Sequence, residues 1–117
     1  MTATRPLAGL LELDRAVHEP ARLAILTVLA SANEAEFRFL ETATGLTPGN
    51  LSSHSSRLEL AGYLKVRKTF RGRVPVTWLR ITPAGRDALS NYWATLQRAS
   101  AGQVTSPPQT SKRSPSK

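Results

Sequence analysis

Hydrophobic residues in the first half of the chain recur every three or four positions, as they do in amphipathic helices. Residues 7–18 have this spacing, with acidic and basic residues opposite the apolar ones. A second helix begins near Pro20, whose missing N–H costs nothing in a first helical turn. Its sequence, ARLAILTVLASA, is apolar on almost every side, which predicts the buried central helix. A short third helix, AEFRFLETATG, ends at Gly45, which suits a tight turn between helices.

The pattern then changes from helix to strand around Gly62. LTPGNLSSHSSRLELAG predicts a fourth helix over residues 47–61, with Thr47 accepting the backbone N–H of Asn50 as its N-cap. After Gly62 come two β-type runs, YLKVRKTF and VTWLRI, joined by a glycine-containing loop, and they predict a hairpin over residues 64–81. TPAG restarts a helix with the same Thr-Pro pair that begins the fourth one.

These elements predict a mainly α domain with a β-hairpin, in the order α-α-α-α-β-β-α, over residues 1–99. Residues 100–117, SAGQVTSPPQTSKRSPSK, lack aromatic residues and contain a single large apolar one. This composition predicts a disordered, basic, Ser/Pro-rich tail. A chain of 117 residues with 40% hydrophobic content suits one small folded domain.

Composition removes several classes of function. The chain has no cysteine, so disulfides and thiolate zinc sites are excluded. With only two histidines, a metal site would need carboxylates from several places, and we expect no metal and no cofactor. The longest apolar run, LAILTVLA, is too short for a membrane span, and the N-terminus does not resemble a signal peptide. We therefore expect a cytoplasmic protein without a membrane partner.

The net charge of +8 is unevenly distributed. Residues 1–56 contain four arginines and six acidic residues, whereas residues 57–117 contain twelve basic residues against Glu59 and Asp87. Such an asymmetry indicates a polyanionic partner that approaches one side of the molecule. Charge alone does not separate DNA, RNA and anionic lipid.

The order of helix, short helix, tight turn, helix and basic hairpin is that of a winged helix-turn-helix. A helix that enters the major groove needs short hydrogen-bonding side chains near its N-terminus, so that its backbone approaches the base edges. Its exposed N-terminus also suits a phosphate, and Arg57, late in the helix, suits a phosphate more than a guanine. The residues expected to bind DNA from this helix are Thr47, Gly49, Asn50, Ser52, Ser53, His54, Ser56 and Arg57.

The hairpin carries the second set of expected DNA contacts. A wing beside the duplex needs cations at its tip, where they reach the phosphates or the minor groove. We place Lys68, Arg71 and Arg73 at that tip, with Gly72 allowing the tight turn. The expected wing contacts are Lys65, Lys68, Arg71, Gly72 and Arg73.

Three separated stretches carry a family resemblance: HEPARLAIL, FRFLETATGLTPGNLSSHSSRLELAGYLKVRKTFRGRVP and ITPAGRDAL. Over roughly residues 10–97 they resemble the small winged-helix transcriptional regulators of the MarR/ArsR-like group. The resemblance implies a homodimer, with repression favoured, that binds a pseudo-palindromic double-stranded DNA site through one recognition helix per half-site. It also allows a small-molecule effector between the dimer helices and the DNA-binding core. The dimer interface that it implies comprises Leu7, Leu10, Leu11, Val17, Leu89, Tyr92, Trp93 and Leu96.

Ser55 departs from the family pattern, which usually has leucine after the SSH histidine. Helical spacing places it beside Leu51 and Leu58, so we expect it to be at least partly buried. The hydroxyl costs little if it bonds back to the Leu51 carbonyl. Otherwise a neighbour such as Phe70 fills the space, or the helix is less firmly anchored.

Other interpretations compete with DNA reading. The serines around His54 suggest a nucleophile and base, but a working dyad needs a third group that orients the base, and only Glu59 is near in sequence. We therefore expect no enzyme. For His18 we favour an interaction with the C-terminal end of a helix, and for Trp78 ordinary hairpin packing over stacking on a basic side chain. A protein-binding module and a nonspecific DNA- or RNA-binding protein remain alternatives.

Overall fold

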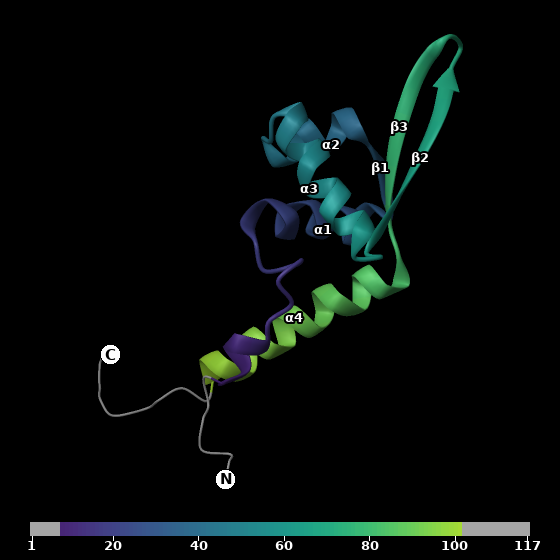
Figure 1. Cartoon of the computed structure of the whole chain (residues 1–117). Coiled ribbons are helices and arrows are strands. Elements are labelled where there is room, and N and C mark those ends of the chain that lie inside the picture. The colour runs from purple at the N-terminus through teal and green to yellow at the C-terminus, as the bar shows by residue number, and fades with distance from the viewer. Residues whose placement is uncertain (1–7, 102–117) are drawn as a thin grey trace, which may run out of the picture. The chain divides into compact units, whose positions relative to one another are not determined.

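The structure, a computed structural model, describes residues 8–101. Leu7 of the expected interface and the expected tail beyond residue 101 lie outside the described residues. The chain forms two compact units, residues 14–92 and, among the described residues, 8–13 with 93–101. The elements, in chain order (Figure 1), are η1 (Ala8–Glu12), α1 (Pro20–Ala32), β1 (Glu34–Glu36), α2 (Phe37–Thr44), α3 (Pro48–Leu60), β2 (Leu64–Arg71), β3 (Val74–Ile81) and α4 (Pro83–Ala101).

The core of the larger unit forms around α1, as its apolar sequence predicts. This helix contacts α2, α3, β1 and β3. Burying a leucine or isoleucine side chain contributes about 1.5–3 kcal/mol, so the buried apolar residues of this core supply much of the favourable free energy of folding. The largest fully buried side chains are Val17, Ile25, Leu26, Leu29, Leu40, Leu51, Leu58, Leu64 and Leu79.

The helices begin and end where local chemistry predicts. The hydroxyl of Thr47 accepts the backbone N–H of Asn50 at 3.2 Å, with proline in the first turn. Gly45 ends α2 in the left-handed conformation, with φ of 76°. At the start of α4, Thr82 accepts the N–H of Gly85 at 3.0 Å in the same way. Gly85 packs so closely that a Cβ there would lie 2.1 Å from the Tyr63 carbonyl oxygen.

Two parts of the predicted element order are wrong in detail. The first helix, expected over residues 7–18, is the five-residue 3₁₀-helix η1 followed by turns. Asp14 favours a turn after η1, because its side chain accepts the Ala16 N–H at 2.9 Å and so competes with helical backbone bonding. The second difference is the strand β1, which the sequence pattern assigned to a turn and the third helix.

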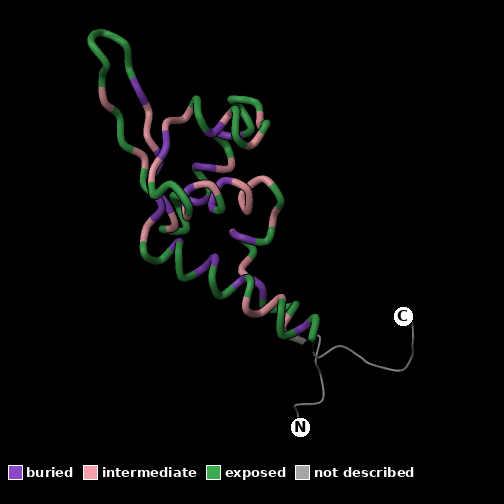
Figure 2. Tube along the Cα trace, turned by 180° about the vertical axis from the view of Figure 1, so that it is seen from behind, coloured by how far each residue is buried: buried purple, intermediate pink, exposed green. Residues whose placement is uncertain are grey.

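The sheet is antiparallel, with strand order β1-β3-β2. Glu34 of β1 pairs with Arg80, and Leu64 of β2 pairs with Ile81. The hairpin turns at Gly72, whose φ is 67°, and extends away from α1–α3 (Figure 1). Its far end is exposed on both strands, whereas buried residues concentrate in the helices and at the base of the sheet (Figure 2).

The hairpin register corrects the expected position of Lys68. Lys68 pairs with Thr77, whereas Arg71 pairs with Val74 next to the turn. Lys68 therefore lies partway along the hairpin rather than at its tip, because the two strands continue pairing for three more residues. Arg71 and Arg73 do flank the turn, as predicted.

The smaller unit pairs η1 with the second part of α4. A Cβ added at Gly9 would contact the Thr95 methyl at 3.5 Å. Its large apolar side chains are unusually exposed, with Leu11 86% and Trp93 46% exposed. Along residues 8–101 no helix has the length and apolar character needed to cross a lipid bilayer.

Candidate nucleic-acid interface

The first two turns of α3 present short polar side chains to solvent. The helix turns Leu51, Ser55 and Leu58 inward. A Cβ added at Gly49 would meet no atom of residues 8–101 within 4 Å, so the backbone there is open to an approaching ligand. The exposed residues that the sequence predicted on this surface are Thr47, Gly49, Asn50, Ser52, Ser53, Ser56 and Arg57.

His54 is held from within the protein and is half-buried. Its Nδ1 lies 3.1 Å from Nη1 of Arg22 and 3.8 Å from Oε1 of Glu19. Arg22 is itself fixed, because its Nε donates to the Ala16 carbonyl at 2.7 Å. Since the guanidinium donates to Nδ1, Nε2 is the ring nitrogen left to donate to another partner. No hydrogen bond within residues 8–101 joins His54 to a serine hydroxyl, so the geometry shows no nucleophile–base pair.

Arg57 belongs to a cluster of three arginines. With Arg15 and Arg22 it lines a hollow of about 360 Å³ beside the end of α3. Clustered guanidinium groups suit a phosphate, which fits the phosphate role expected for Arg57. Sequence reasoning missed Arg15 and Arg22, because they come from the half of the chain whose net charge is negative.

Two wing arginines are paired with carboxylates of β1. Arg71 lies 3.1 Å from Glu36, and Arg67 lies 3.2 Å from Glu34. The Arg67 guanidinium also lies 5.4 Å from the centre of the Trp78 ring, so stacking on a basic side chain describes Trp78 better than the ordinary packing that we expected. The ion pairs among the described residues include none at Lys65, Lys68 or Arg73.

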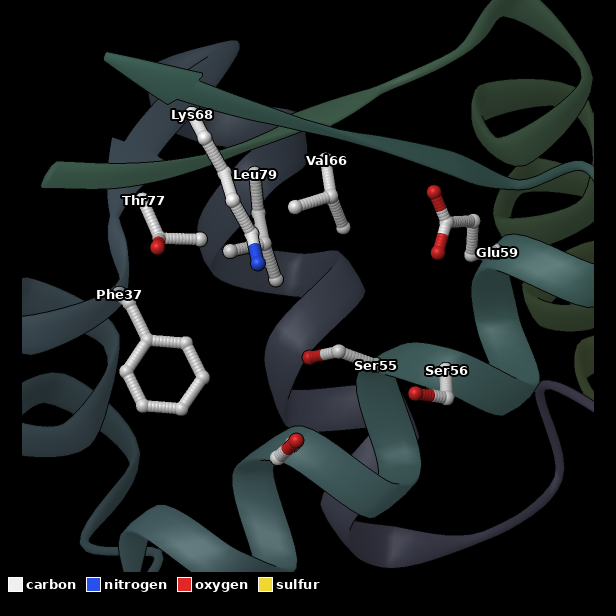
Figure 3. A pocket seen from close by; sticks show the side chains of 9 residues that line it. Phe37, Ser55, Ser56, Glu59, Val66, Lys68, Thr77 and Leu79 are labelled. Atoms are coloured by element: carbon white, nitrogen blue, oxygen red, sulfur yellow. The ribbon is translucent and has the colours of Figure 1, made fainter. Parts of the chain in front are cut away.

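The structure contradicts both expected means of accommodating Ser55. The residue is 4% exposed, as its helical position predicts. Within residues 8–101 its hydroxyl has no hydrogen-bonding partner, so it does not bond back to Leu51. Phe70 is 71% exposed and does not fill the space. A cavity of about 530 Å³ lies there instead, between α3 and the hairpin (Figure 3).

Tyrosine hydroxyls tie the segment before α1 to the rest of the larger unit. Tyr63 donates to Oδ2 of Asp14. His18 lies just before α1, not at the C-terminal end of a helix, and its Nδ1 is 3.0 Å from the Tyr92 hydroxyl. The expected interaction of His18 with a helix C-terminus is therefore wrong.

The residues expected at a dimer interface differ in accessibility. Val17 is fully buried within its own chain, and Leu89 and Tyr92 are nearly so. Leu10, Leu11 and Trp93 are exposed, and Leu96 is intermediate. Among the described residues no three His, Cys, Asp or Glu side chains gather as a metal site would require.

Known proteins resemble both the sequence and the fold. The family model of the winged helix DNA-binding domain matches residues 21–99. An uncharacterised protein of Methanocaldococcus jannaschii is 39% identical over 72 residues, which are 61% of this chain and 77% of that protein. The structure of a transcriptional regulator homologue from Pyrococcus horikoshii OT3 matches with a TM-score of 0.75 and 31% identity, over 80% of this chain and 95% of that one.

A MarR-family transcriptional regulator from Silicibacter pomeroyi is similar in fold. Its TM-score is 0.58 at 20% identity, over 82% of this chain and 64% of that one.

Proposed function

Since this chain belongs to the winged helix DNA-binding domain family, we propose that it is a sequence-specific transcriptional regulator that binds double-stranded DNA as a homodimer. The family is defined by DNA binding and not by a reaction, and a similar structure is that of a transcriptional regulator homologue. A surface that reads DNA would account for the serines around His54 without catalysis.

The observation that carries the proposal is the exposed polar surface of α3. Gly49, Asn50 and Ser53 combine open backbone with short hydrogen-bonding groups, which are the features that let a helix lie against base edges. Arg57, in its cluster of three arginines, then contacts a phosphate at the far end of the helix.

The wing would supply DNA contacts that do not depend on the base sequence of the duplex. Arg73 lies in the exposed turn and takes part in no ion pair within residues 8–101. It is therefore the wing cation most available to a phosphate or to the minor groove. Lys65 and Lys68 are exposed along β2 and add to the positive potential.

Dimerisation is proposed through the smaller unit, where Leu10, Leu11 and Trp93 are exposed. Isolated domains seldom leave such residues together in solvent, and an interface would cover them. Two recognition helices related by a twofold axis would meet the two halves of a pseudo-palindromic site. A dimer seated on such a site would block access to a promoter, so we propose repression. A regulator of this kind works beside the chromosome, in the cytoplasm.

Selection of bound sequences from random duplex DNA tests this proposal. We expect one enriched palindromic sequence and a slope of about −5 to −9 in log affinity against log salt, if a dimer contacts roughly six to ten phosphates. Asn50→Ala should change the preferred sequence, whereas Arg73→Ala should weaken binding to all duplexes alike. Asn91→Ala, on α4 away from α3, is the matched control.

The alternatives give different results in the same experiment. A protein-binding module would show no salt-sensitive DNA binding. A nonspecific nucleic-acid-binding protein would bind without enriching any sequence, and would bind duplex RNA as well. An unchanged preference in the Asn50 variant would contradict readout by α3.

A further inference from the structure

The cavity beside Ser55 has two chemically different walls. The strand wall is apolar around Val66 and Leu79, and Phe37 adds an aromatic ring at one side (Figure 3). The helix wall carries the hydroxyls of Ser52 and Ser55. A volume of about 530 Å³ is within the range of sites that hold small organic ligands.

Ser55 provides the strongest indication that this cavity receives a polar group. The residue is 4% exposed, and its hydroxyl, which has no hydrogen-bonding partner in the part of the chain that the structure describes, points into the cavity (Figure 3). Buried polar groups in proteins almost always have a partner, because an unpaired one destabilises the fold. A ligand atom that accepts the Ser55 proton would supply that partner.

Opposite charges lie at the two sides of the cavity. Lys68 lies on the side of Thr77 and Phe37, whereas Glu59 lies beyond Val66 on the other side (Figure 3). Both side chains are exposed, and no ion pair among the described residues joins them. Ser52 and Glu59 mark the length of the helix wall, about 10 Å at 1.5 Å per residue.

We propose that this cavity binds a short peptide of two or three residues with free termini. Lys68 would bind the terminal carboxylate and Glu59 the terminal ammonium group. The Ser55 hydroxyl would donate to a peptide carbonyl between them, and an apolar side chain would lie against Phe37 and Leu79. An extended dipeptide spans about 7 Å, which two flexible charged side chains can bracket, whereas a single amino acid carries both charges on one carbon.

A DNA phosphate fits this cavity less well. Duplex DNA cannot enter far enough to meet a hydroxyl that is 4% exposed. The Glu59 carboxylate would also repel a phosphate, although it would attract an ammonium group. The interior of the cavity therefore suits an ammonium-bearing ligand better than a phosphate, while Ser52, Ser56 and Lys68 belong both to its lining and to the expected DNA contacts.

The consequence for regulation rests on the proposed DNA-binding function. The peptide would join α3 to β2, and its carboxylate would neutralise Lys68, an expected wing contact. Bound peptide should therefore lower DNA affinity, which would make the site inhibitory.

The binding test is an NMR titration of the ¹⁵N-labelled full chain, without DNA. Glycyl-L-leucine should shift the amides of Ser55, Val66 and Leu79 in a saturable way. N-acetylglycyl-L-leucine, which lacks the ammonium group, and glycyl-L-leucinamide, which lacks the carboxylate, should each bind about 5–10-fold more weakly. Equal affinity for all three peptides, or no saturable shift, would overturn the proposal.

Two substitutions locate the site. Ser55→Leu, which restores the leucine of the family pattern, should fill the cavity and abolish the shifts while DNA affinity stays unchanged. Glu59→Gln, at an exposed position, should remove the difference between the free and the acetylated peptide. Persistence of the shifts in Ser55→Leu, or of that difference in Glu59→Gln, would refute the assignment.

DNA binding is measured separately with the duplex obtained by selection. Saturating glycyl-L-leucine should weaken the wild-type complex several-fold and leave the Ser55→Leu complex unaffected. Peptide binding without any effect on DNA affinity would overturn the regulatory role. Peptide binding by a protein that binds no duplex would instead disprove the proposed function and leave the peptide site standing.

Discussion

Tyr63 and Asp14 form a contact with a measurable pH dependence. The Tyr63 hydroxyl donates to the Asp14 carboxylate, and this hydrogen bond, followed by burial and by the carboxylate charge, raises the pKa of Tyr63 to about 12. An unfolded tyrosine has a pKa of about 10. The folded-state pKa is the higher one, so the contact stabilises the fold below about pH 10 and loses this effect between about pH 10 and 12.

Tyr63→Phe should therefore lower the free energy of unfolding by roughly 1.5–3 kcal/mol near pH 7. The difference between the variant and the wild type should shrink as the pH rises past about 10, because the phenol then ionises in the unfolded wild-type chain while it stays protonated in the folded one up to about pH 12. Urea denaturation from neutral pH to about pH 12 would measure this. Parallel curves for the two proteins over the whole range would contradict it.

The burial of a single residue could be predicted from the sequence where helical geometry alone determines which way its side chain points. Ser55 is buried because it shares a face with Leu51 and Leu58, and the spacing showed this. Its hydroxyl faces the cavity between α3 and the hairpin, and no local sequence pattern contains the spacing of those two elements. Arg22 and His54 are 32 positions apart, so their contact could not be inferred from either stretch.

At the scale of elements, β1 limits the positive charge of the wing. Glu36 on this edge strand pairs with Arg71 of β2 across the central strand β3. The pair is largely exposed, so it contributes little to stability, but the carboxylate offsets a cation expected to face DNA.

Glu36→Gln should therefore raise affinity for any duplex by about 2–5-fold at low salt, and salt should reduce the gain. Asp87→Asn makes the same change of net charge at an exposed position on α4 and is the control. Fluorescence anisotropy at several salt concentrations would compare the two. An equal gain in both variants would show that net charge alone is responsible.

The elements that the sequence predicted well are those with strong local signals. A Thr-Pro pair identifies the start of α3 and of α4 from local sequence alone. The β-type residues of β2 and β3 likewise identify those strands without knowledge of their tertiary contacts. The strand β1 has three residues and exists only through its pairing with β3, so it carries no such signal. Residues 7–18 have helical spacing, but the side-chain hydrogen bond of Asp14 competes with it.

At the scale of the whole molecule, the proposed dimer makes the oligomeric state depend on the exposed apolar residues of η1. Leu11→Glu alters a residue that is 86% exposed, so the fold of the single chain should be unaffected. If η1 forms part of the interface, the variant should sediment as a monomer and bind DNA with about half the salt slope of the dimer. Leu60→Glu, at an equally apolar position that is 88% exposed on α3, should leave the oligomeric state unchanged.

A Leu11→Glu protein that remains dimeric would exclude η1 from the interface. Loss of the dimer in Leu60→Glu would place the interface on α3, where it would compete with DNA. Sedimentation velocity distinguishes these outcomes without DNA.

Composition predicted that the molecule has a polyanionic partner, but it did not predict which basic side chains are paired with carboxylates. The basic second half indicated a polyanionic partner, and the family supplies DNA as that partner. Sequence reasoning assigned Arg71 to DNA without a competing partner. The fold brings Glu34 and Glu36 of the acidic half against Arg67 and Arg71, and no count of residues could show that pairing.

Two glycines that follow Thr-Pro pairs differ in how far each can vary. A Cβ at position 85 would collide with the Tyr63 carbonyl, whereas one at position 49 would meet no atom of the described residues within 4 Å. Gly49 lies on the surface proposed to face the bases, so a substitution there can add a side chain to that surface without a steric clash at its Cβ. If this surface reads the bases as proposed, single substitutions at position 49 would give descendants of this protein a route to a new DNA sequence preference that leaves the scaffold intact.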